Sequence, residues 1–231
     1  MKHDRLLLGG LLAMCLVHPL LLLLGACFGF EVIVRSWGIH GVVFTALFVF
    51  LSIRALRREE EAQTGSILAA LLFPASAVHA FVWTIGKGRS WLAALLSLVW
   101  VGFSAALMMK NTKSFGAKIA AYFLSILILL PTFAGVLMLP FALGHHTVMQ
   151  TITSPERTHR AEAIDSDQGA LGGDTIVEVY DLRKQWDAII FLFQKEPQEI
   201  YWGDWGEFKT MKLEWQSEQV LLINGKPYGI Q

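Results

Sequence analysis

One short stretch of this chain combines acidic side chains and glycines in a way that could bind an ion or a phosphate. Residues 166–175 read SDQGALGGDT, and Asp165, Asp167 and Asp174 offer the oxygen ligands that calcium prefers. Gln168 and Gly169 break the EF-hand spacing, and a strand pattern follows the glycines where a phosphate loop requires a helix. We therefore predict a glycine-rich connection between two strands, with calcium binding by the three aspartates as the alternative.

Two histidines lie inside long apolar segments. His18 and His79 are 12 and 13 residues from the starts of their segments at Leu6 and Ser66, so they could face each other at similar depth. Such a pair could ligate a haem through both axial positions. The simpler interpretation is hydrogen bonding between helices, which stabilises packing. We adopt this interpretation and expect no cofactor, with the haem pair as the alternative.

Four aromatic residues fall within residues 201–208, which read YWGDWGEF. Tyr201, Trp202, Trp205 and Phe208 are spaced by glycine and acidic residues. Aromatic side chains with polar ends dominate recognition surfaces, so this stretch is a candidate contact with a partner, a glycan or a lipid headgroup. The alternative is that the tryptophans fill the core of a small domain.

The motifs of common enzymes are absent. The sequence has no HExxH motif, no serine at a nucleophile elbow with a matching histidine and aspartate, and no carboxylate pair spaced for glycoside chemistry. Cys15 and Cys27 both lie in the first apolar segment, and no CxxC motif occurs. We therefore expect a protein that is not an enzyme.

Composition indicates a membrane protein. Of 231 residues, 54% are hydrophobic and only 16% are charged, and mean hydropathy is +0.49. The net charge of zero conceals a basic first part, with eleven Lys and Arg against five Asp and Glu in residues 1–144, and an acidic remainder with eight against fourteen. An acidic domain lacks the clustered cations that bind phosphates, which excludes nucleic acid as its partner.

Five segments are long enough to cross a bilayer, which takes about 20 apolar residues. They are residues 6–28, 36–56, 66–85, 91–109 and 119–143. The fold class predicted for residues 1–144 is a membrane α-helical bundle of five transmembrane helices. No Asp, Glu, Lys or Arg lies in the core of a segment, which argues against pumps and ion-coupled transporters.

The distribution of Lys and Arg between the short connections predicts the orientation. With the N-terminus inside, the connections on the inner side carry eight cations, and those on the outer side carry three. The inner cations are Lys2, Arg5, Arg54, Arg57, Arg58, Lys110, Lys113 and Lys118. The outer cations are Arg35, Lys87 and Arg89. Five crossings then leave the C-terminal domain outside. We expect the bacterial cytoplasmic (inner) membrane, with the lipid bilayer as one partner and another membrane or envelope protein as a second.

The first segment also resembles a lipoprotein signal. Leu24-Gly-Ala-Cys27 matches a lipobox, in which the cysteine would be acylated. The apolar run before Cys27 is longer than a signal sequence uses, so we expect an uncleaved helix and keep the lipobox as the alternative.

The remaining residues change from a helical to an alternating pattern. Residues 145–157 are predicted to form a polar stalk, and residues 158–231 an all-β domain outside the cytoplasm, either an antiparallel meander or a small sandwich. The expected strands cover residues 159–165, 175–181, 188–193, 199–202, 210–215, 219–224 and 226–231. The third of these is apolar throughout, which predicts a central strand.

Several motifs of this domain carry a resemblance to a known group. Ser154-Pro155, the GALGG loop and Thr175-Ile-Val-Glu-Val-Tyr180 are similar to the hairpins of small exported β domains in uncharacterised multi-pass membrane proteins of Gram-positive bacteria. Residues 211–225 also look like the end of a propeller-type blade. The resemblance implies the fold and the compartment, and it implies no activity. Glu156-Arg157 departs from it, since that turn prefers Asp-Gly.

The expected function is that of an accessory or sensor-like membrane protein. Its exported β module would bind a partner, an envelope component or a small ligand. One alternative is a membrane-embedded subunit of a transport or haem-containing complex, in which His18 and His79 are functional. The other is a calcium-dependent ectodomain that uses Asp165, Asp167 and Asp174.

Overall fold

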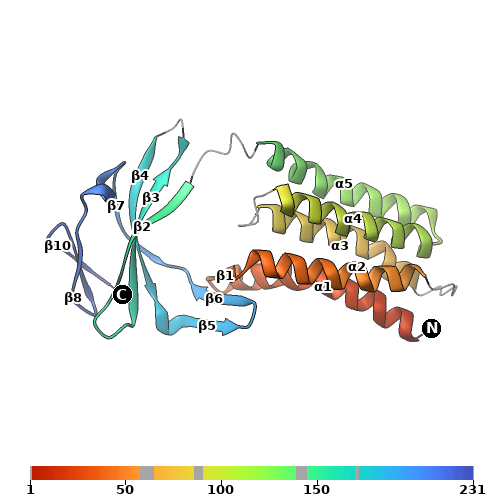
Figure 1. Ribbon diagram of the computed structural model, residues 1–231, viewed down its shortest axis with the longest axis horizontal. Coiled ribbons are helices and arrows are strands. Elements are labelled where there is room, and N and C mark those ends of the chain that lie inside the picture. Colours follow the sequence, from red (N-terminus) through yellow and green to blue (C-terminus); the bar gives the residue numbers. More distant parts are fainter. Residues whose placement is uncertain (1, 58–64, 86–90, 139–144, 170–171, 231) are drawn as a thin grey trace. The chain divides into compact units, whose positions relative to one another are not determined.

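The computed structural model describes residues 2–57, 65–85, 91–138, 145–169 and 172–230 (Figure 1). The chain divides into two compact units. The first comprises Met1–Leu24 and Val34–Pro140, and the second comprises Gly25–Ile33 and Phe141–Gln231. The first is helical and the second is mostly β, so the predicted bundle with a C-terminal antiparallel β domain is confirmed at this level.

Within the described ranges, five helices are long and apolar enough to cross a membrane. They are α1 (Lys2–Cys27), α2 (Trp37–Leu56), α3 (Gly65–Ile85), α4 (Trp91–Asn111) and α5 (Phe115–Met138). The end of the fifth predicted segment, residues 139–143, lies outside the described residues. Helix α2 begins after Ser36, whose hydroxyl accepts a hydrogen bond from the Ile39 amide.

The helices bury one face and leave another apolar face uncovered. Helix α3 packs against both α4 and α5, and Leu11, Phe48, Leu72 and Trp100 are completely buried in the core. The outer face of α5 is equally apolar, and Phe123 is 71% exposed there. An uncovered apolar surface of this kind is rare on soluble monomers and suits a lipid environment.

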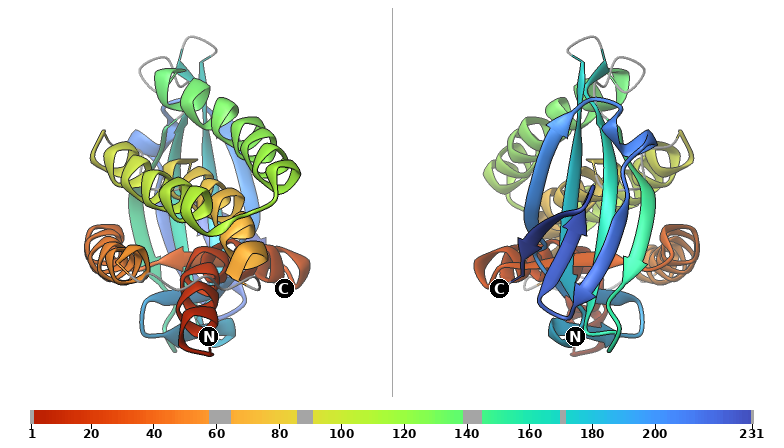
Figure 2. Two further views of the ribbon diagram at one scale, coloured as in Figure 1. Left: turned by 90° about the vertical axis from the view of Figure 1, so that its right-hand side faces the viewer. Right: turned by 90° about the vertical axis from the view of Figure 1, so that its left-hand side faces the viewer.

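The second unit contains two sheets that form a sandwich. One has the strand order β2-β3-β4-β7 and the other β10-β9-β8. Figure 2, right, shows β8–β10 in front of the four-stranded sheet. The strands are β2 (His145–Thr153), β3 (His159–Asp167), β4 (Gly173–Asp181), β7 (Gln198–Asp204), β8 (Leu213–Ser217), β9 (Val220–Ile223) and β10 (Lys226–Gly229), with 3-10 turns η3 (Leu182–Lys184) and η4 (Glu207–Lys209).

The core of the sandwich follows from alternation along these strands. Ala161 pairs with Val179, and Ala163 pairs with Val177, so small and branched side chains share one face. Leu221 and Ile223 approach this face from the other sheet, and all belong to one buried cluster. The module therefore has its own hydrophobic core.

A third sheet contains a strand from the connection between α1 and α2. Its order is β1-β6-β5, with β1 (Phe30–Val34), β5 (Gln185–Ala188) and β6 (Phe191–Lys195). Strand β1 follows the first helix after two residues, yet all of it except Val34 belongs to the same compact unit as β6. The sequence predicts no strand in this short connection between the first two apolar segments.

Two further segments differ from the predictions. Residues 145–157 were expected as a polar stalk, but His145–Thr153 forms β2, because its Thr, Val and Ile residues suit a strand and pair with β3. Residues 188–193 were expected as one central strand. They instead contain the turn Ile189–Ile190 of a hairpin, and Ile189 is 96% exposed.

Candidate functional site

Three histidines from three helices converge in the bundle. The ring centroids of His18 on α1 and His79 on α3 lie 6.0 Å apart. The ring of His40, on α2, lies 6.0 Å from His18 and 6.5 Å from His79. His18 and His79 are buried. The structure thus brings the predicted pair together and adds His40, which the sequence places only near the outer end of its segment.

Aromatic side chains enclose this histidine cluster. Phe44 stacks on His79 at 4.3 Å, while Trp37 meets His18 edge-on at 5.7 Å. Trp83 lies 5.3 Å from His40. A Cβ atom at Gly41 would lie 2.7 Å from Trp83, so only glycine on α2 admits this indole so closely.

Imidazoles held this close can ligate a metal or haem, or they can pack and hydrogen-bond. In the described part of the chain, no group of three His, Cys, Asp or Glu side chains is arranged to hold a metal ion. The stacked Phe44 ring also occupies one face of His79. Axial haem ligation by His18 and His79 remains the alternative to packing.

The β module presents a second candidate surface. Trp202 is 60% exposed and Trp205 is 56% exposed, whereas Phe208 is buried at 8%. The tryptophans are therefore available to a ligand, and Phe208 is not. Tyr201 is half-buried, and its hydrogen bond to the Glu207 carboxylate raises its pKa to about 12.

Local contacts fix the position of Trp205. Its Nε1 donates a hydrogen bond to Asp165 Oδ1 at 3.0 Å. Its ring lies over Gly173, where a Cβ atom would be 2.6 Å from Trp205 Cδ1. An exposed tryptophan held in one orientation loses little rotamer freedom when it binds a ligand.

Trp202 ends an apolar row that crosses the four-stranded sheet on the face opposite the sandwich core. The row is formed by successive register partners Val148, Ile164, Ile176 and Trp202. We call it the Trp202 row. The two isoleucines are buried, while Val148 and Trp202 at the ends are exposed.

Carboxylates flank the Trp202 row on both sides. On one side Asp174 pairs with Asp204, and on the other Glu178 pairs with both Glu162 and Glu199. Like charges opposite each other destabilise a sheet. Arg160 offsets part of this cost through an ion pair with Glu162 at 2.8 Å. The face is therefore apolar at its centre and negative at its edges.

The aspartates of the predicted calcium site are not brought together. Register places Asp174 opposite Ser166, on the other face of the sheet from Asp165 and Asp167. Asp167 accepts a hydrogen bond from the Gly169 amide, and Asp174 accepts one from the Gln168 side chain. The loop tip, residues 170–171, lies outside the described residues.

A hydrogen-bonded network links the turn after β2 to the β8–β9 hairpin. Glu218 accepts hydrogen bonds from Thr158 Oγ1 and from the Glu156 amide, and His159 Nδ1 lies 3.6 Å from Glu218 Oε2. Burial would raise the carboxyl pKa, but these hydrogen bonds outweigh it and lower the pKa of Glu218 to about 2. Buried Ser154 accepts the His159 amide hydrogen bond at 3.0 Å, so it acts as a structural acceptor.

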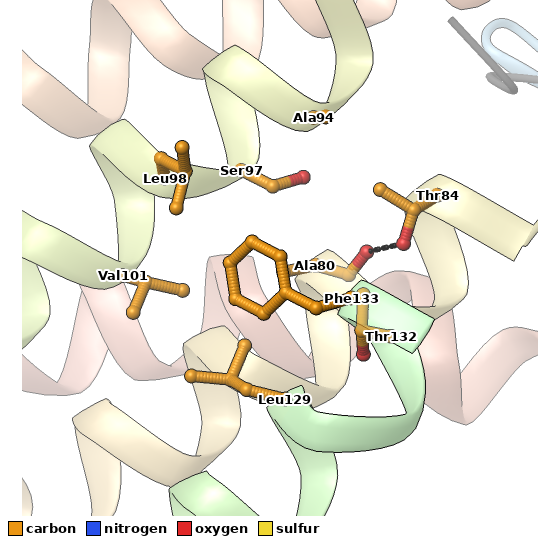
Figure 3. A pocket seen from close by; sticks show the side chains of 9 residues that line it. All are labelled: Ala80, Thr84, Ala94, Ser97, Leu98, Val101, Leu129, Thr132 and Phe133. Atoms are coloured by element: carbon orange, nitrogen blue, oxygen red, sulfur yellow. Dashed lines mark hydrogen bonds between the residues drawn. The ribbon is translucent and has the colours of Figure 1, made fainter. Parts of the chain in front are cut away.

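A small cavity lies among α3, α4 and α5 (Figure 3). Its volume is about 30 Å³, enough for a single water. The hydroxyls of Thr84, Ser97 and Thr132 line it, but each donates to a carbonyl of its own helix. The cavity is therefore an apolar packing gap and offers no polar group to a ligand.

Comparison with known proteins adds no relative: no family model, curated protein or solved structure matches this chain.

Proposed function

We propose that this chain is a five-span bacterial membrane protein that displays a β module outside the cytoplasm and uses it to recognise a partner, an envelope component or a small ligand. It performs no chemistry of its own. The observation that carries the proposal is that both indoles, of Trp202 and Trp205, are more than half exposed. Trp202 ends the row on a face that is apolar at its centre and acidic at its edges, and Trp205 lies near the same end of the sheet on its other face, beside Asp165.

The chemistry of this face suggests the kind of ligand. Exposed indoles supply large apolar contacts, as they do at binding hot spots and sugar-stacking sites. The carboxylates beside the Trp202 row favour a ligand that carries positive charge and disfavour anionic ones. An apolar or sugar-like ligand group with cationic substituents fits both features.

The β1 strand supports the proposed topology. It lies between α1 and α2, whereas its partner β6 follows α5 in the chain. Hydrogen-bonded strands must lie on the same side of a membrane. Four helices separate them, and an even number of crossings returns the chain to that side. The pairing therefore supports five crossings, and the distribution of Lys and Arg supports placing that side outside.

The test uses the full-length protein in nanodiscs, with binding of purified envelope components followed by tryptophan fluorescence and sedimentation. Trp202→Ala and Trp205→Ala should each weaken binding at least about tenfold, because truncating a hot-spot tryptophan costs about 2 kcal/mol or more. Glu214→Ala, an exposed change on β8 of the other sheet of the sandwich, is the control. If Trp202→Ala and Trp205→Ala bind as tightly as the control variant, the proposed binding surface at these two tryptophans is refuted.

A second candidate function is supported by the convergence of His18, His40 and His79. These rings could belong to a haem-containing or transport complex, in which the bundle would supply axial ligands. Protein purified in mild detergent should then show a Soret band that is lost in His79→Ala and in His18→Ala. Absence of the band after expression with added haem would leave packing as the role of this cluster.

A further inference from the structure

The hairpin β5–β6 presents an apolar turn that is chemically unusual. Ala188 pairs with Phe191, which leaves Ile189 and Ile190 as its two turn residues. Ile189 has a φ of +46° and is 96% exposed. Two-residue hairpin turns favour Gly, Asn or Asp, and a β-branched residue at positive φ is strained. Neither folding nor water solubility explains isoleucine at this position.

More exposed apolar surface accompanies this turn. Trp186 is 65% exposed and stacks on Phe193 across the hairpin, with ring centroids 4.8 Å apart. Figure 1 shows the turn between β5 and β6 directed away from the four-stranded sheet. The hairpin therefore extends an isoleucine pair and an indole beyond the sandwich.

The same compact unit contains the end of the first helix. Residues Gly25–Ile33 belong to it, and Gly25 packs so closely on Val32 of β1 that a Cβ atom would lie 2.6 Å from Val32 Cγ2. The Gly29 carbonyl accepts a hydrogen bond from the Glu196 amide, directly after β6. The end of a membrane-length helix is thus joined through β1 to the hairpin.

The apolar surface of that helix continues to its end. Leu20, Leu23, Leu24 and Phe28 are all about half exposed or more. Beside Phe28, the Lys195 ammonium lies 3.4 Å from the Phe28 carbonyl and 5.4 Å from the Phe30 ring. A lysine with aromatic rings at the end of an apolar helix is typical of the membrane–water interface.

We propose that the Ile189–Ile190 turn, with Trp186, lies in the interfacial layer of the bilayer on the side where α1 ends. Lipid is the occupant because the hairpin is tied to the end of a span and because its tip has the composition of an interfacial anchor. A short apolar insertion of this kind fixes the height and tilt of the module above the membrane. The inference rests on the proposed membrane insertion of the helices.

The experiment places an environment-sensitive NBD label on single cysteines in the full-length protein, reconstituted into phosphatidylcholine–phosphatidylglycerol vesicles. The background carries Cys27→Ser, since Cys27 is exposed and Cys15 is buried. The test position is Ile189→Cys. Phe123→Cys on α5 reports membrane insertion, and Glu214→Cys on β8 reports the aqueous surface of the module. Unsubstituted background protein provides the blank.

At position 189 we expect a blue-shifted emission that is quenched by lipids doxyl-labelled near the headgroup and protected from aqueous iodide. Iodide quenching at position 189 together with lipid quenching at position 123 would overturn the inference and leave the membrane topology intact. Protection of position 189 from both quenchers would also overturn it, because a protein partner or a second copy would then cover the turn. Iodide quenching at position 123 would contradict insertion and the inference together.

Discussion

At the scale of single residues, Glu218 shows how one carboxylate can stabilise two hairpins. It accepts hydrogen bonds from the turn after β2, although it belongs to the turn between β8 and β9. Sequence spacing gives no sign of this, since Glu218 and Thr158 are 60 residues apart. The pKa of Glu218 is lowered to about 2 because the fold brings hydrogen-bond donors from distant parts of the sequence to its carboxylate.

We predict that Glu218→Gln destabilises the β module and makes its stability less dependent on acid pH. The folded pKa of Glu218 lies below its ordinary value of 4.5, so its stabilisation is fully present above pH 4.5 and is lost as pH falls towards 2. Melting temperature measured from pH 7 to pH 2 should therefore fall more steeply in the unsubstituted protein than in the variant. Glu214→Gln, an exposed change on β8, should behave like the unsubstituted protein; a steep fall retained in Glu218→Gln would disprove this role.

The histidines illustrate what sequence can predict at this scale. Equal depth within two apolar segments was enough to predict that His18 and His79 could face each other. His40 was missed as a third member because it lies three residues into α2, where depth alone suggests the interface. Its partners depend on how α2 packs, and Gly41 controls that packing by admitting Trp83.

At the scale of elements, the end of the β3–β4 hairpin positions the candidate binding residue. Gly173 begins β4 and pairs with Asp167, and the Trp205 ring lies directly over it. The glycines of this stretch are predicted from the sequence to form a connection between two strands. Gly172 has a φ of +97°, which favours glycine, but the φ of Gly173 is not positive. Glycine is required at position 173 because a side chain there would collide with the Trp205 indole.

We predict that Gly173→Ala weakens ligand binding although it leaves both tryptophans in place. The new methyl group would lie 2.6 Å from Trp205 Cδ1 and 2.8 Å from the Ser166 carbonyl, so the indole must move. Overpacking of this kind costs about 1–3 kcal/mol, measurable as a lower melting temperature. Gly229→Ala on β10, where no atom lies within 4 Å of the added carbon, is the control. Unchanged binding and stability in Gly173→Ala would show that Trp205 is not held by this contact.

The predictions of strands succeeded where alternation was clear and failed where composition misled. Residues 159–165 and 175–181 lie within β3 and β4 because one face meets a core. The run from Ala188 to Phe193 has no alternation, so its apolar residues could not be divided between a turn and two strands. β1 was missed because its partner, β6, follows the fifth helix. β2 pairs with the next strand, β3, and was missed because its polar residues suggested a stalk.

At the scale of the whole molecule, topology links the two compact units. The five helices were predictable because length and hydropathy suffice to recognise them. The boundary between the two units was not predictable from the sequence, because part of the connection between α1 and α2 belongs to the β unit. A strand from the first loop can pair with one beyond the fifth helix only when both lie on the same side of the bilayer.

The most direct test of this account is a pair of reporter fusions after Gln231 in bacterial cells. Alkaline phosphatase is active only when exported, and green fluorescent protein sent through the same export route fluoresces only when it stays in the cytosol. The account predicts an active phosphatase fusion and a dark fluorescent fusion. A fluorescent fusion with inactive phosphatase would place the module inside the cell and contradict its proposed role outside the cytoplasm.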